Sequence, residues 1–246
     1  MTSDVSVVFV HGLFGPLDDP AAFRRLSPAV CSAPDLCGYG RLIGEPVSLS
    51  GQVEALRSNI RDLHPGQRVH LVGHSIGAVY AFALADESPE LVQTITTVEG
   101  NFTLADAFWS RTIAALEEDQ AQAEIEKRLT APEEFLAADG ITATPAILAK
   151  AEQALAYQPW RTVWESAAAI VETTAAPEYE AMLRRVFDHH RVHLVAGERS
   201  VSGWDVPAWA RAGAASWTVI PGVGHMMMLE DPEAFGNVLN QQFATA

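Results

Sequence analysis

Short runs of apolar, largely β-branched residues punctuate the first hundred positions of this chain. Each run has the length and composition of a buried strand. They are Val5–Val10, Ala29–Ala33, Val69–Val72 and Leu91–Val98. Between them, apolar residues recur at helical spacing, which predicts helices over Pro20–Leu26, after Ser50, and from Ser75 to about Glu87. Ser50 can cap the second of these helices, whose apolar positions are Val53, Leu56, Ile60 and Leu63. Strands that alternate with helices predict parallel βαβ units.

The alternation stops near residue 103 and resumes near residue 191. Between these points the pattern favours helices separated by prolines. The predicted helices are Ala105–Leu129, Pro132–Ala138, Pro145–Tyr157, Thr162–Thr173 and Pro177–Asp188. Two more strands follow, Val192–Ala196 and Ser216–Ile220, and then a last helix that Asp231 caps. The sequence therefore predicts one α/β core domain, residues 1–102 and 191–246, with an all-helical cap insertion at 103–190.

Composition narrows the classes of partner. The formal net charge of −15 disfavours nucleic acid and anionic membranes as partners, because both would repel the chain. No apolar stretch approaches the roughly 20 residues of a membrane span. The start, Met1–Val5, lacks a basic segment, so no signal peptide is expected. Cys31 and Cys37 cannot build the disulfide framework of a secreted protein, and a cytoplasmic location with free thiols is expected.

Gly73–Gly77 reads Gly-His-Ser-Ile-Gly, directly after a predicted strand and before a predicted helix. This context is typical of a nucleophile elbow, in which glycines flank a serine on a turn too tight for side chains. A serine hydroxyl needs a base within hydrogen-bond reach. His225 is the best candidate among the eight histidines, because it lies in a glycine-rich loop, Pro221–His225, after the last strand.

Together these motifs resemble the α/β-hydrolase fold superfamily with a lid, whose central sheet is mostly parallel and flanked by helices. The matching residues occur in the family's order: His11-Gly12, Pro34–Gly40, Gly73–Gly77, Gly224-His225 and Glu230-Asp231-Pro232. The resemblance implies Ser75 as nucleophile and His225 as general base. It also implies an oxyanion hole made by the backbone N–H groups of Leu13 and Ile76.

The acid of the triad departs from the family pattern. Where the family usually has Gly-x-x-Asp, this chain has Gly197-Glu198-Arg199-Ser200, and serine cannot stabilise an imidazolium ion electrostatically. Asp205 is one replacement, although its place before Val206-Pro207 also suits a helix cap. Glu99 is the other, since it ends the strand after the nucleophile helix and should reach the same rim of the sheet. Our prediction is Glu99; the competing interpretation is a carboxylate that caps Asn101 or Thr103 or pairs with an arginine.

The predicted substrate pocket is apolar. Phe14 and Met226 flank the predicted site, Phe102 opens the insertion, and Trp109, Trp160 and Trp164 lie within it. One or two of the last four are expected to contact a ligand. No phosphate-binding glycine motif occurs, and the histidine-rich segment 188–193 lacks the spacing of a metal site, so neither a cofactor nor a metal is expected.

The leading hypothesis is a cofactor-independent serine hydrolase that acts on a small apolar ester or lactone. Two alternatives remain open at this stage. The same triad could break a carbon–carbon bond, as a hydrolase or lyase, or the fold could serve as a non-catalytic receptor for a small molecule. The sequence also leaves open whether the chain is a monomer or a homodimer.

Overall fold

The structure, a computed structural model, describes residues 5–244. The first four residues, which belong to the segment in which no signal peptide is expected, lie outside the described part. Six parallel strands form one sheet in the order β2-β1-β3-β4-β5-β6. Their bounds are Ser6–Val10 (β1), Val30–Ser32 (β2), Val69–His74 (β3), Val92–Val98 (β4), Arg191–Gly197 (β5) and Ser216–Ile220 (β6). The predicted α/β class with a parallel sheet is confirmed.

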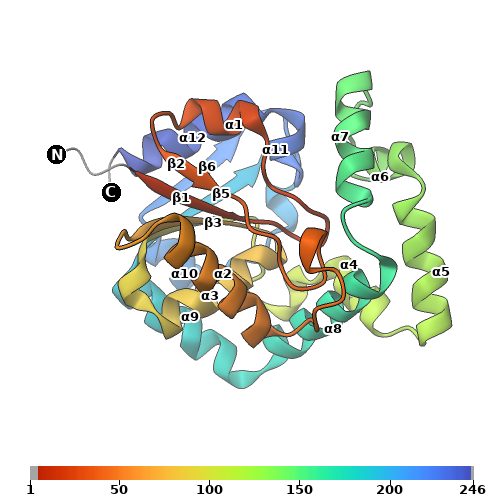
Figure 1. Cartoon of the computed structure of the whole chain (residues 1–246), viewed down its shortest axis with the longest axis horizontal. Helices are drawn as coiled ribbons and strands as arrows, with labels where there is room; N and C mark the ends of the chain where they lie inside the picture. The colour runs from red at the N-terminus through yellow and green to blue at the C-terminus, as the bar shows by residue number, and fades with distance from the viewer. Residues whose placement is uncertain (1–4, 245–246) are drawn as a thin grey trace.

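Helices cover both faces of the sheet (Figure 1). One face carries α1 (Pro20–Arg25), α11 (Met227–Glu230) and α12 (Pro232–Phe243), and the other carries α2 (Leu49–Leu63), α3 (Ile76–Glu87), α9 (Pro177–His189) and α10 (Ala208–Gly213). Successive side chains of a strand point to opposite faces. In β1, Val7 and Phe9 pack in the first layer, and Val8 and Val10 pack in the second. Because both faces are buried, the strand is a continuous apolar run rather than an alternating one.

The strand order reverses between β1 and β3. The chain leaves β1, adds β2 on its outer side, and then returns to place β3 on the inner side. The loops that follow β1 and β3 therefore run apart from each other at the carboxyl ends of these strands. Ligands of open α/β sheets bind in the crevice at such a position. Ser75 follows β3 directly, and the His11–Phe14 loop follows β1.

Between β4 and β5, residues 103–190 contain helices joined by turns and loops and no strand, and the structure describes all of them. Helices α5, α6 and α7 stand beyond one end of the sheet (Figure 1). The bounds of the insertion helices are Phe108–Ala114 (α4), Glu118–Leu129 (α5), Pro132–Ala138 (α6), Pro145–Leu155 (α7) and Trp160–Ala175 (α8). Short 3-10 turns lie at Gly40–Leu42, Pro89–Leu91, Leu104–Asp106 and Val201–Gly203.

Three local predictions need correction. The single helix predicted over 105–129 is broken before Glu118, because Glu117 has extended backbone angles, φ −63° and ψ 154°. The cap of α2 is Ser48 and not Ser50, since the helix begins at Leu49 and the Ser48 hydroxyl accepts from the Gly51 amide at 3.1 Å. Helix α9 falls within the predicted insertion, but its Leu183 and Val186 pack in the core layer beside α3. Asp231, by contrast, caps α12 as predicted.

Within residues 5–244, the helices are all too short or too polar to cross a bilayer. Cys31 and Cys37 are free thiols, each partly buried.

Buried histidines predict a loss of stability in mild acid. Burial lowers the pKa values of His11, His70 and His193 to about 4. In the unfolded chain these histidines are protonated below about pH 6.5, their ordinary pKa. In the folded chain they stay neutral until about pH 4. Stability therefore falls between pH 6.5 and 4, by an amount on the order of a few kcal/mol. Asp106, whose pKa burial raises to about 6, acts in the opposite direction, as do Asp18, Asp139 and His225, whose pKa values are also raised.

Thermal melts between pH 7 and pH 5 check this expectation. The melting temperature should fall at pH 5, and the fall should be smaller in His70→Asn, which removes one buried imidazole. His189→Asn serves as the matched control, because His189 is exposed. A melting temperature that is unchanged or higher at pH 5 would contradict the assignment of neutral buried histidines.

Candidate active site

Ser75 occupies the sharp turn between β3 and α3. Its backbone angles are φ 52° and ψ −125°, far from those of either flanking element. A Cβ on Gly77 would lie 2.3 Å from the Val10 carbonyl oxygen, and one on Gly73 would lie 2.5 Å from the Ala78 Cα. Side chains at these two positions would thus push α3 away from the sheet. The glycines allow the close approach that the elbow requires.

Glu99 shares the unusual positive φ angle of Ser75. Among the described non-glycine residues, only Ser75 and Glu99 have positive φ, 52° and 43°. Such conformations cost on the order of 1–3 kcal/mol each, and they persist where the surrounding structure holds them. The amides of both residues continue the sheet ladder: Ser75 donates to Val98 and Glu99 donates to Val195, each at 3.0 Å. Strain in this fold is therefore concentrated at the predicted nucleophile and the predicted acid.

Glu99 and His225 form the predicted pair. The His225 Nδ1–H donates to Glu99 Oε2 at 2.7 Å, although the residues are 126 positions apart. The other oxygen, Oε1, accepts from the Gly197 amide at 2.8 Å and from the Ser200 hydroxyl. Glu99 is 7% exposed. A buried carboxylate with three donors is held in one orientation, and it fixes the imidazole as the tautomer with its free nitrogen on the far side.

Each partner shifts the pKa of the other. Burial alone would lower the pKa of His225, but the hydrogen bond and charge of Glu99 outweigh it, and the pKa lies above its usual value. Burial alone would raise the pKa of Glu99, yet the His225 contact and the donors from Ser200 and Gly197 keep it below its usual value. Glu99 therefore stays ionised at neutral pH, and it stabilises the imidazolium form of His225.

Asp205 is not close to this pair. Its Oδ2 accepts from the Thr103 hydroxyl at 2.8 Å, and its amide donates to Asp106 at 2.7 Å. It does not cap α10 either, since Pro207 occupies the cap position. The interpretation of Asp205 as a helix cap was therefore wrong, and among the described residues the hydrogen-bond partner of His225 Nδ1 is Glu99 rather than Asp205.

The loop that carries His225 is fixed by an ion pair. Arg199 pairs with Glu230 at 2.7 Å and also donates to the Gly222 carbonyl. Glu230 accepts in turn from the Gly224 amide at 2.7 Å. Arg199 and Ser200 are neighbours, so one turn after β5 holds both the histidine loop and the Glu99 carboxylate.

The two predicted oxyanion donors, Leu13 and Ile76, line the same pocket as Ser75. Ile76 is the first residue of α3, and no side chain caps this helix. The Gly12 carbonyl accepts from His11 Nδ1 at 2.8 Å, which fixes the orientation of the planar Gly12–Leu13 peptide and hence of the Leu13 N–H. The Leu13 carbonyl accepts from the Tyr39 hydroxyl at 3.3 Å. Among the described residues, no acceptor pairs with either N–H, and both residues line the pocket that contains Ser75.

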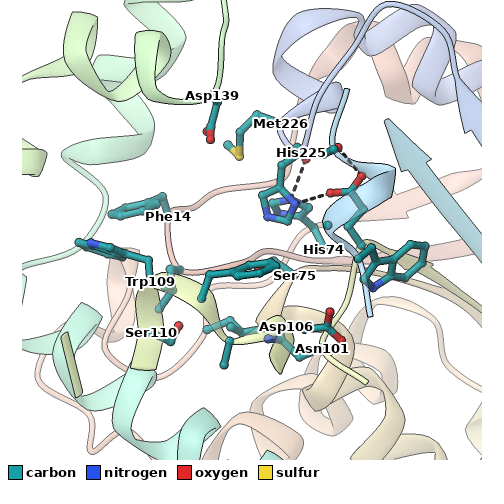
Figure 2. A pocket seen from close by; sticks show the side chains of 18 of the residues that line it. Phe14, His74, Ser75, Asn101, Asp106, Trp109, Ser110, Asp139, His225 and Met226 are labelled. Atoms are coloured by element: carbon teal, nitrogen blue, oxygen red, sulfur yellow. Dashed lines mark hydrogen bonds and ion pairs between the residues drawn. The ribbon is translucent and has the colours of Figure 1, made fainter. Parts of the chain in front are cut away.

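Ser75 and His225 share one cavity of about 270 Å³. No hydrogen bond joins the Ser75 hydroxyl to the imidazole among the described residues. Contacts of this kind are often long in free enzymes and shorten in complexes. Figure 2 shows the cavity with His225 and Met226 on one side and Phe14 and Trp109 at its end.

Of the predicted pocket residues, Phe14, Trp109 and Met226 line the cavity, and three others do not. Phe102 packs against Phe82, Phe187 and Trp204 in the core. Trp160 and Trp164 contact each other and pack in the cluster between α4, α5 and α8. Sequence reasoning missed further lining residues, since the packing of the insertion helices decides which side chains face inward. These are His74, Asn101, Asp106, Ala107, Phe108, Ser110, Arg128, Phe135, Asp139, Ser200, Gly203 and Trp204.

A comparison with known protein families agrees with this fold. A family model described as "Alpha/beta hydrolase family" matches residues 7–238. The chain belongs to the alpha/beta hydrolase family. The protein ABHD8 of Bos taurus and that of Homo sapiens are each 32% identical over 105 residues, which are 40% of this chain and 24% of the relative. The match therefore spans about a quarter of the length of these curated relatives.

Solved structures extend the comparison to the whole chain. A carboxylesterase of the thaumarchaeon Nitrososphaera gargenis is 17% identical with a TM-score of 0.73, covering 99% of this chain and 91% of its own. A thermophilic esterase of Thermogutta terrifontis is 18% identical with a TM-score of 0.70, covering 98% and 90%. The haloalkane dehalogenase DatA of Agrobacterium tumefaciens is 18% identical with a TM-score of 0.72, covering 99% and 91%. At these identities the likeness concerns the fold, and with family membership it supports a hydrolase.

Ser200 is a residue whose role the sequence did not predict. It occupies the place of the acid in the turn typical of the alpha/beta hydrolase family, and its hydroxyl donates to Glu99. Ser200→Ala removes one donor to a buried carboxylate, which is worth about 1.5–3 kcal/mol. We expect kcat/KM on an ester substrate to fall about tenfold or more, and Ser200→Thr to retain most of the activity. Equal activities of Ser200→Ala and the unaltered chain would show that the Gly197 amide alone is sufficient to hold Glu99.

Proposed function

We propose that this chain is a serine hydrolase that cleaves a small apolar carboxylic ester or lactone through an acyl-enzyme on Ser75. One observation carries the proposal. His225, which donates to the buried Glu99 at 2.7 Å, lines the same pocket as Ser75 with its strained backbone. A base whose orientation is fixed by a carboxylate, in the same pocket as a hydroxyl on a tight turn, is the arrangement that activates a weak nucleophile.

The reaction would proceed in two halves. His225 Nε2 takes the Ser75 proton as Oγ attacks the carbonyl carbon, and the oxyanion that forms accepts from the Leu13 and Ile76 amides. The tetrahedral intermediate expels the alkoxide, which takes the proton from the imidazolium, and an acyl-serine remains. Water then attacks, with His225 again as base, and the acid leaves with Ser75 restored. Glu99 stays ionised throughout, and it stabilises the imidazolium in both halves.

The size and lining of the cavity support a small substrate. Phe14, Trp109 and Phe135 form an apolar wall, with centroid distances from Phe14 of 5.8 Å to Trp109 and 5.3 Å to Phe135. Arg128 lies over the Trp109 ring at 4.2 Å. A cavity of about 270 Å³ bounded by these rings suits short acyl and alkyl chains rather than a long fatty acid.

Hydrolysis of p-nitrophenyl butyrate and of γ-butyrolactone tests the proposal, together with labelling by a fluorophosphonate probe. We expect turnover of the ester, and a covalent label on Ser75 that is lost in Ser75→Ala. A chain that binds small esters tightly, turns none of them over and takes no label would be a receptor on the same fold. Turnover of a vinylogous diketone without turnover of esters would indicate cleavage of a carbon–carbon bond instead.

A further inference from the structure

The pocket contains a polar amide with no partner. Asn101 lines the cavity and is 2% exposed; its Oδ1 is buried without a hydrogen-bond partner, and its Nδ2 donates to no described residue. A buried amide without partners costs on the order of 1–3 kcal/mol. Buried polar groups of native proteins are nearly always satisfied, so an exception that lines a ligand cavity requires an explanation.

The backbone on both sides of Asn101 is held firmly. The Gly100 carbonyl accepts from Trp204 Nε1 at 2.7 Å, and the Asn101 carbonyl accepts from the Tyr179 hydroxyl. The next amide, that of Phe102, donates to Asp106 at 2.9 Å. A Cβ on Gly100 would lie 3.4 Å from the Ser75 carbonyl oxygen, so this segment runs against the elbow itself. The amide is thus presented at a fixed place near the nucleophile.

A second polar group comes from the insertion. Ser110 on α4 lines the same cavity, is 4% exposed, and its hydroxyl makes no hydrogen bond with a described residue. Figure 2 shows Ser110 and Asn101 on the side of the pocket away from His225 and Met226. Because His225 must protonate the leaving alkoxide, the alcohol half of an ester lies on the His225 side. The acyl half then extends toward Asn101 and Ser110.

We propose that Asn101 and Ser110 form a subsite for a hydroxyl group on the acyl chain of the substrate, which makes them specificity-determining residues. This inference rests on the proposed ester hydrolysis at Ser75. A hydroxyl suits both partners, since an amide and a serine hydroxyl can each donate and accept. A neutral group is favoured over a carboxylate, because Asp106 lines the cavity beside Asn101, whereas the one arginine or lysine among the described lining residues, Arg128, lies over the Trp109 ring.

Matched esters test the subsite on the full chain. The substrates are ethyl butyrate and the ethyl esters of 2-, 3- and 4-hydroxybutyrate. Their hydrolysis is measured by the release of acid. The unaltered chain should favour at least one hydroxylated ester over ethyl butyrate by about tenfold in kcat/KM, the value of one or two neutral hydrogen bonds. In Asn101→Leu, which keeps the size of the side chain, this ratio should fall to about one. Ser110→Ala should lower it in part.

Controls separate the possible failures. Asn237→Leu, an exposed position on α12, should leave the ratio unchanged. Fluorophosphonate labelling of Ser75 checks that Asn101→Leu keeps its site, and Ser110→Ala gives a second reading if that variant does not fold. Hydrolysis of ethyl butyrate without any preference, or a preference that survives in both variants, overturns the subsite alone. Failure to hydrolyse any ester, with no label on Ser75, overturns the proposed function and the subsite together.

Discussion

We expect Ser75→Ala to lower kcat/KM for p-nitrophenyl butyrate by roughly 10⁴- to 10⁶-fold, the largest loss of any single substitution. In the proposed mechanism no acyl-enzyme can form without the hydroxyl, although the Leu13 and Ile76 amides and the apolar wall would still bind the ester. The residual rate should exceed that of the ester in buffer, because oxyanion stabilisation does not depend on the serine. Steady-state kinetics and intact-protein mass after the fluorophosphonate measure the two losses together.

Stability and location controls make this result specific. The substitution removes one hydroxyl that has no hydrogen bond with a described residue, so the melting temperature should change little. Ser50→Ala, at an exposed position near the start of α2, should leave both activity and labelling unchanged. Retention of more than about a tenth of the activity in Ser75→Ala would exclude it as the nucleophile.

We expect Glu99→Gln to lower kcat by about 10³- to 10⁴-fold, whereas the kcat of Asp205→Asn should stay close to that of the unaltered chain. The amide cannot stabilise an imidazolium ion, and its NH₂ would face the His225 Nδ1–H unless the tautomer changes. Among the described residues, the Asp205 carboxylate accepts only from the Thr103 hydroxyl, so we expect its charge to matter little at the site. Parallel kinetics on the two variants compare the candidate acids directly. A collapse of activity in Asp205→Asn with Glu99→Gln intact would reverse the assignment.

The pH profile gives an independent check of the same pair. Activity requires neutral His225, so kcat/KM should rise with pH through the His225 pKa, which Glu99 holds above its usual value despite burial. In Glu99→Gln the raising effect is lost, and the acidic limb should move to lower pH. A limb that does not move would show that Glu99 is not electrostatically coupled to the base.

A double substitution tests whether the acid can return to the turn after β5. Ser200→Asp alone places a second carboxylate against Glu99, and like charges in contact disfavour ionisation of both. Glu99→Asn removes the first carboxylate, and asparagine tolerates the positive φ of 43° at this position. The combination Glu99→Asn with Ser200→Asp should therefore recover part of the activity that Glu99→Asn loses. No recovery would show that the Ser200 position does not reach His225 in this chain.

Much of the fold was readable from local pattern. The apolar runs located all six strands within about two residues, because strands buried on both faces must be apolar throughout. The elbow was readable as well, since the Gly73 and Gly77 contacts are imposed by a turn that the pentapeptide itself specifies. Helix limits in the insertion were less accurate, because Ala-rich segments permit a helix without fixing where it breaks.

The sequence by itself determined the parallel α/β layer, the serine on its turn and the histidine loop, since each depends on residues adjacent in the chain. Only the tertiary structure decided which residues from distant parts of the chain contact the serine turn and the histidine loop. Glu99 reaches His225 across 126 positions because the parallel neighbours β4, β5 and β6 end at the same rim, and the end of β5 brings Gly197 and Ser200 to the same carboxylate. The pocket wall, with Asn101 facing it and Phe102 turned into the core, depends on how the insertion packs. Contacts between distant segments are set by burial of whole faces, and no local pattern of residues encodes them.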